Sequence, residues 1–154
     1  MRSERHAKID GSQWVDDLLD IIYSVGRCDW STVKGCQWSA LLSELPRFVD
    51  KCDWSKLDGE CWTKLLSEQP QFADHCDWRK LDGVNWSYLL RCQPQFSDRC
   101  DWSKLDGSDW RSLLTKHPEF ADQCDWDRLD GADWCVLLRD RPEFVEYCDY
   151  SMLL

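Results

Sequence analysis

Hydrophobic residues return at fixed positions along this chain, with a period of 24 residues between Cys28 and Tyr147. Five copies of the pattern Cys-Asp-Trp-x-x-Leu-Asp-Gly-x-x-Trp-x-x-Leu-Leu-x-x-x-Pro-x-Phe follow one another without gain or loss of a residue. Self-similarity at such a period is typical of stacked repeat proteins. An array of equivalent units is therefore expected, rather than a few unlike residues that converge once on a catalytic centre.

The first half of each copy predicts an amphipathic helix. In the second copy Asp58 precedes a glycine, and its carboxylate can cap the first turn and complement the positive end of the helix dipole. Trp62, Leu65 and Leu66 follow at the i, i+3 and i+4 positions of one helical face. We expect a helix over residues 59–68.

The second half of the copy predicts a shorter helix and a turn. Pro70 disfavours helix at the residue before it and suits the first position of a new helix, which we expect over residues 70–75, with Phe72 buried. Asp77 offers a cap for a 3₁₀ turn from Trp78 to Leu81. No segment alternates with a period of two over the length of a strand, so the predicted fold class is all-α: a solenoid of short helix pairs.

The domain organisation follows from the repeat, because a lone copy cannot bury both faces of its helices. We expect one domain over residues 1–154. It comprises a modified N-terminal cap with a partial repeat (1–27), five full repeats (28–147) and a truncated C-terminal repeat (148–154).

The charge balance narrows the choice of partners. Nineteen Lys and Arg against 29 Asp and Glu give a net charge of -10, which disfavours direct contact with nucleic acid. No leader-like apolar region follows the first charges, and no stretch reaches the length of a membrane span. We expect a cytoplasmic protein without a membrane partner.

Six of the ten cysteines share one repeat position, and the other four show no C-x-x-C pair. Packed helices lie ~8–10 Å apart, whereas a disulfide needs Cα atoms within ~7 Å, so neighbouring copies should not crosslink. We expect reduced thiols packed as small apolar groups, without a zinc site.

Two Asp columns and two Trp columns also run through the repeats. A calcium ion needs six to eight oxygens around one centre. Equivalent Asp residues of neighbouring copies lie ~10 Å apart and cannot bind the same ion. We therefore interpret the Asp residues as helix caps. The Trp residues alternate with Leu at helical spacing, which favours core packing over a stacking platform for bases or sugars.

Catalysis has little support in the sequence. His6, His75 and His117 are the only histidines, none is paired with a repeated nucleophile, and the last two occupy substitutable positions typical of solvated surface. No phosphate loop or carboxylate pair stands out from the repeat background. We therefore expect no enzyme activity, no cofactor and no metal.

The repeats resemble the tandem repeats of another group of proteins. The "LDG-x-DW-x-x-LL … P-x-FAD-x-CDW" pattern is similar to tandem Trp-rich repeats of uncharacterised bacterial proteins, over about Ile9 to Tyr150. The resemblance implies a bacterial or phage origin and a repeat architecture, and it transfers no active-site residue. Copy one departs from the pattern, because Lys34-Gly35 replaces Asp-Gly at the expected helix start.

Differences between copies point to a contact surface. Positions nine, ten, twelve, thirteen and sixteen to eighteen vary freely, and we expect them on the exposed side of the first helix. Free variation of this kind also arises where a surface only meets solvent. The candidate partner-binding residues at these positions are Glu60, Lys64, Glu68, Val84, Tyr88, Arg91, Asp109, Ser112, Asp133 and Val136.

Three functions remain open from the sequence. The first is a non-enzymatic module that binds another protein through the variable helix face. The second is an inhibitor or immunity-type protein whose carboxylate columns imitate nucleic acid and block a basic nuclease or effector surface. The third is a structural spacer or a self-assembling repeat protein.

Overall fold

A computed structural model describes residues 29–153, and the chain divides into two compact units, the first ending at Leu57 and the second beginning at Asp58. We describe each unit by itself. The predicted N-terminal cap (1–27) and Cys28 lie outside the described residues. The prediction of one domain over the whole chain stays a prediction.

The first unit contains one copy of the repeat. A 3₁₀ turn, η1 (Trp30–Thr32), precedes the helix α2 (Gly35–Glu44). The 3₁₀ helix η2 (Pro46–Lys51) and the turn η3 (Trp54–Lys56) follow. Trp38, Leu41 and Leu42 of α2 are fully buried.

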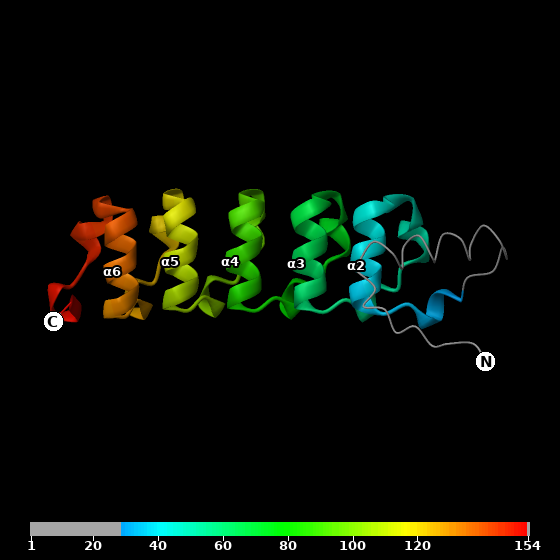
Figure 1. The fold of residues 1–154 in the computed structure, drawn as a ribbon, viewed down its shortest axis with the longest axis horizontal. Helices are drawn as coiled ribbons and strands as arrows, with labels where there is room; N and C mark the ends of the chain where they lie inside the picture. Colours follow the sequence, from blue (N-terminus) through cyan, green and yellow to red (C-terminus); the bar gives the residue numbers. More distant parts are fainter. Residues whose placement is uncertain (1–28, 154) are drawn as a thin grey trace, which may run out of the picture. The chain divides into compact units, whose positions relative to one another are not determined.

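The second unit stacks four further α-helices, each of which contacts the next (Figure 1). They are α3 (Gly59–Glu68), α4 (Gly83–Cys92), α5 (Gly107–Lys116) and α6 (Gly131–Asp140). A longer 3₁₀ helix follows each of them: η4 (Pro70–His75), η6 (Pro94–Arg99), η8 (Pro118–Gln123) and η10 (Pro142–Tyr147). Short 3₁₀ turns complete the copies: η5 (Trp78–Lys80), η7 (Trp102–Lys104), η9 (Trp126–Arg128) and η11 (Tyr150–Leu153).

The predicted fold class is confirmed: residues 29–153 are all-α without a strand, and the second unit is a solenoid of helix pairs. The predicted bounds 59–68 and 70–75 match α3 and η4, although the second helix of every pair is of the 3₁₀ type. Six residues, from the proline to the residue before an extended cysteine, leave room for few i→i+4 bonds, which favours the tighter helix. None of these helices is long and apolar enough to cross a membrane.

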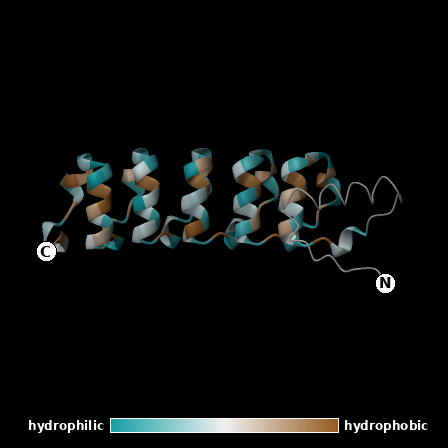
Figure 2. Cartoon of the chain, viewed as in Figure 1, coloured by the Kyte–Doolittle hydropathy of each residue, from teal (hydrophilic) through white to brown (hydrophobic). Residues whose placement is uncertain are grey.

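Stacked aromatic rings form the centre of the first, third, fourth and fifth copies. The inner Trp column is almost wholly buried, and in the third copy Trp78 stacks on Trp86 with ring centroids 5.4 Å apart. The same Trp78 ring lies 5.4 Å from Phe96. Core packing is thus confirmed for the inner column, while the outer column is half-buried. Figure 2 shows that each helix of the second unit carries both hydrophobic and hydrophilic turns, as expected of helices covered on part of their surface.

The Asp-Gly pairs cap the helices as predicted. Asp58 accepts a hydrogen bond from the backbone amide of Cys61 at 2.8 Å, and Asp82, Asp106 and Asp130 repeat this contact. In copy one Lys34 offers no acceptor, and only the reciprocal bond forms, from the Lys34 amide to Gln37 Oε1 at 2.9 Å. Helix α2 nevertheless begins at the same repeat position as the others.

Two long side chains link neighbouring copies within the second unit. Lys104 Nζ donates to the carbonyls of Arg79 and Leu81, at 3.0 and 2.7 Å. Arg128 Nη1 repeats the second contact one copy later, with the Leu105 carbonyl at 2.9 Å. These cations satisfy carbonyls that the short 3₁₀ turns leave unpaired, so the stack is held by polar as well as apolar contacts.

None of the nine described cysteines forms a disulfide. Burial raises the pKa of Cys76, Cys100 and Cys124 to about 12, because desolvation disfavours the thiolate. These residues fit the prediction of packed thiols. The prediction is wrong for Cys36, Cys92 and Cys135, which are exposed because their helix positions face outwards.

Candidate functional site

A groove of about 830 Å³ lies between α3 and α4. One side is lined by Glu60, Thr63, Lys64, Ser67 and Glu68 of α3, and the other by Val84, Asn85 and Tyr88 of α4. Asp58, Gly59, Lys80 and Asp82 line the end at which both helices begin. The groove therefore coincides with a set of positions that vary between copies.

Two exposed apolar side chains distinguish the α4 wall. Val84 and Tyr88 keep 65% and 49% of their surface exposed, and they lie one helical turn apart at i and i+4. The equivalent α3 positions carry Glu60 and Lys64. An apolar wall thus faces a charged one along the length of the groove.

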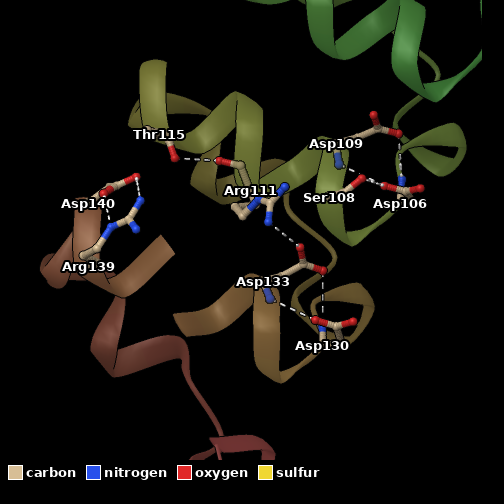
Figure 3. A network of polar contacts seen from close by, with 9 residues as sticks. All are labelled: Asp106, Ser108, Asp109, Arg111, Thr115, Asp130, Asp133, Arg139 and Asp140. Carbon is tan, nitrogen blue, oxygen red and sulfur yellow. Dashed lines mark hydrogen bonds and ion pairs between the residues drawn. The ribbon is translucent and has the colours of Figure 1, made fainter. Parts of the chain in front are cut away.

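Two of the α3 side chains that line the groove, Thr63 and Ser67, are short. Thr63 turns its hydroxyl onto its own helix, where Oγ1 donates to the Gly59 carbonyl at 2.8 Å. At the position of Thr63, α5 carries Arg111, whose Nη1 lies 3.5 Å from Asp133 Oδ1 of α6 (Figure 3). At the position of Ser67, α4 carries Arg91. In α5 the longer side chain thus reaches the next helix, which Thr63 of α3 does not.

The lining of the groove carries four carboxylates and two lysines, a net charge of -2. The backbone hydrogen bond from Cys61 holds the pKa of Asp58 below its usual value, so this carboxylate stays charged at neutral pH. The groove consequently presents a modest excess of negative charge beside its apolar wall.

Five of the ten predicted partner-binding residues meet in this groove: Glu60, Lys64, Glu68, Val84 and Tyr88. The structure leaves the other five outside it. Arg91, Ser112 and Val136 are partly exposed on α4, α5 and α6.

The predicted exposure of Asp109 and Asp133 is wrong, because these side chains are buried, with 5% and 7% of their surface accessible. Both occupy the third position of a helix and turn back onto its cap. Asp109 Oδ2 accepts from the amide of Asp106 at 3.2 Å, and Asp133 makes the same contact with Asp130 at 3.4 Å. Figure 3 shows both pairs. These acids therefore close capping boxes and do not face a partner.

The sequence analysis placed the positions of Thr63 and Ser67 on the exposed, variable side of the first helix, but it did not name them as partner-binding residues. The expected exposure is wrong for Thr63, of whose surface only 6% is accessible. The sequence held little signal for them, because Ser39, Ser87 and Cys135 are equally small at the position of Thr63. The sequence analysis also missed a second exposed apolar group near the end of the described chain, which comprises Val145, Tyr147, Tyr150 and Leu153.

The histidines differ from each other in their surroundings. His75 is exposed, as expected of a surface position. The prediction is wrong for His117, whose side chain is only 17% exposed. Its Nδ1 lies 2.8 Å from Glu119 Oε1, and its Nε2 lies 3.2 Å from the Arg91 carbonyl of the preceding copy. His117 thus belongs to the contacts between copies.

Among residues 29–153 no group of three or more His, Cys, Asp or Glu side chains is arranged to hold a metal ion. Comparisons with protein-family models, with curated proteins and with solved structures gave no match. The structure does show repeated Trp-containing helix units, in keeping with the tandem Trp-rich repeats that the sequence resembles.

Proposed function

We propose that this protein is a non-enzymatic interaction module that binds a partner protein in the groove between α3 and α4. The observation that carries the proposal is the exposed pair Val84 and Tyr88, held on a rigid helix beside an open groove. Aromatic side chains in a pocket are frequent anchors of protein interfaces. We further propose that this binding takes place in the cytoplasm of a bacterium.

The carboxylate columns give less support to the nucleic-acid mimic. Asp58, Asp82, Asp106 and Asp130 each use a side-chain oxygen to cap a helix, so their spacing has a structural reason. A mimic would also bind through charge alone, whereas the groove adds an apolar wall. The experiment below distinguishes the proposal from the two alternatives, the nucleic-acid mimic and the structural spacer.

The test is affinity capture from a bacterial host lysate, followed by mass spectrometry, with three versions of the protein. The first is the native chain, and the second carries Val84→Ser and Tyr88→Ser. The third carries Val145→Ser and Tyr150→Ser, which remove two other exposed apolar side chains of the same unit. The proposal expects a partner that the native and the third version retain and the second loses.

Circular dichroism of each version establishes that the helices are intact. A partner that all three versions retain, and that only high salt releases, would favour the mimic, because counterion-dependent binding falls steeply with salt. Retention of no partner by any folded version would favour the spacer.

A further inference from the structure

We propose that the occupant of the α3–α4 groove is a cationic amphipathic helical segment of a partner protein. This inference rests on the proposed function and names the chemistry of the partner. Its apolar residues would contact Val84 and Tyr88, and its Lys or Arg residues would lie beside Glu60 and Glu68.

The shape of the groove favours a helix. Helices α3 and α4 are ten residues long, which gives walls of about 15 Å. Val84 and Tyr88 are spaced i and i+4, so their Cβ atoms lie ~5–6 Å apart along one face. A partner helix presents apolar residues with the same spacing, and docking of such a helix in a groove is a common recognition mode. About three turns of helix match the length of the walls.

The negative charge of the groove favours a partner segment with positive charge. Glu60 and Glu68 flank Lys64 on α3, and Asp58 and Asp82 lie at the end where the helices begin. The groove is thus negatively charged, like the whole chain, whose net charge is -10. A cationic segment is therefore attracted from a distance and is complementary at the contact.

Other occupants fit less well. A small molecule is usually enclosed over 70–90% of its surface, whereas the apolar wall here remains open, with Val84 65% exposed. A nucleic acid would meet repulsion from four carboxylates. A second copy of this chain would bring its own acidic surface against the groove.

The probe is a fluorescein-labelled helical peptide of about 14 residues, long enough to span the walls, with Leu along one face and Lys on the other. Its affinity for the full chain is measured by fluorescence anisotropy at low salt and at ~0.15 M salt. Two companion peptides replace every Lys by Glu or every Leu by Ser. The proposal expects the Lys/Leu peptide to bind at both salt concentrations and each companion to bind at least about tenfold more weakly.

The chain itself supplies a variant that closes the groove. Thr63→Arg with Asn85→Asp places in the α3–α4 groove the pair that Arg111 and Asp133 form between α5 and α6. Since these residue types already stand at these positions in later copies, the helices should stay folded, as circular dichroism can verify. The double variant should lose at least about fivefold in affinity for the Lys/Leu peptide, because the inserted pair occupies the space that the peptide needs.

Charge variants test the same contact in both directions. Lys64→Glu should tighten binding of the Lys/Leu peptide by about two- to fivefold, and Glu60→Lys with Glu68→Lys should weaken it by a similar factor. Glu143→Lys with Glu146→Lys is the matched control, because these exposed acids lie on η10, away from the groove. An equal effect of the control pair would mean that only the net charge matters and would overturn the proposal.

The outcomes separate this inference from the proposed function. Equal binding of the Lys/Leu and Glu/Leu peptides, abolished by Tyr88→Ser, would overturn the cationic partner and leave a protein-binding groove. Binding of the Lys/Leu peptide that survives closure of the groove would overturn the inference. So would the absence of measurable binding.

Discussion

Asp109, Asp133 and Asn85 occupy the same position in their helices, yet two are carboxylates and one is a neutral amide. Asp109 is buried, and it receives hydrogen bonds from the Asp106 amide and from Ser87 Oγ at 3.3 Å. Burial is the main reason why its pKa lies above the usual 3.8, and the charge of Asp106 raises it further. Asn85 makes the equivalent backbone contact, with its Oδ1 3.2 Å from the Asp82 amide, without burying a charge.

Asp109→Asn should therefore stabilise the protein at neutral pH. A carboxyl whose pKa is raised by folding destabilises the folded state above that pKa, and this penalty disappears below 3.8, where both states are protonated. The gain of the variant over the native chain should thus be largest near pH 7 and shrink as the pH falls towards 4. Urea unfolding at the two pH values measures it, and a gain that does not depend on pH would contradict the burial argument.

Lys34→Asp should stabilise the first unit, because it restores the cap that every later copy has. An Asp at the N-cap contributes about 1 kcal/mol relative to a residue without an acceptor. Thermal unfolding monitored by circular dichroism measures the change. Asp58→Ala is the matched control and should destabilise by a similar amount; a neutral result for both would show that these caps add little.

At this scale the sequence predicted the capping Asp residues, because Asp-Gly before an apolar helical run is a local signal. It failed for Asp109 and Asp133, because a charged residue at a variable position resembles a solvated one. The signal that was available is the spacing of Asp106 and Asp109, which is that of a capping box with a short acid in the third helical position.

Each structural element of the repeat begins and ends at a residue with a local cause. Asp-Gly starts the α-helices, and the residue before proline ends them, which is why the bounds 59–68 were predictable. The 3₁₀ type of the second helix was not predictable, since the choice between i→i+3 and i→i+4 bonds depends on how the chain must reach the next copy. The constant spacing between the Gly that starts each helix and a residue of the next copy, such as Gly83 and Lys104, is explained only by their contact in the folded structure.

Gly83→Ala should destabilise the second unit. A Cβ at this position would collide with the backbone carbonyl of Lys104 and with Asp109 Oδ2, both in the next copy, and the carbonyl cannot rotate away. Overpacking of this kind costs about 1–3 kcal/mol. Chemical denaturation measures the loss. Val84→Ala, at the next and exposed position of the same helix, should change stability by less than ~0.5 kcal/mol.

At the scale of the whole molecule, stacking supplies the stability and differences between copies supply the groove. The solenoid was predictable, because the 24-residue period is plain in the sequence. The groove was not, because it depends on which residue of one helix lies beside which residue of the next. Thr63 and Ser67 become informative only when α4 is placed next to α3.

Removal of one whole copy tests the stacking. Deletion of residues 100–123 keeps the repeat in register, so that a folded helical protein with a lower melting temperature is expected, because one interface between copies is lost. Deletion of residues 100–111 breaks the register and should greatly reduce helicity. Equal tolerance of the two deletions, measured by circular dichroism, is not compatible with a stack of 24-residue units.

The most direct measurement of the central claim is a scan with a photo-crosslinking amino acid at one repeat position in living host cells. Positions 64, 88, 112 and 136 are equivalent in α3 to α6, but only Lys64 and Tyr88 line the groove. The account predicts a crosslink to the same partner protein from positions 64 and 88, and none from 112 and 136. Equal crosslinking from all four positions, or from 112 and 136 alone, would contradict it.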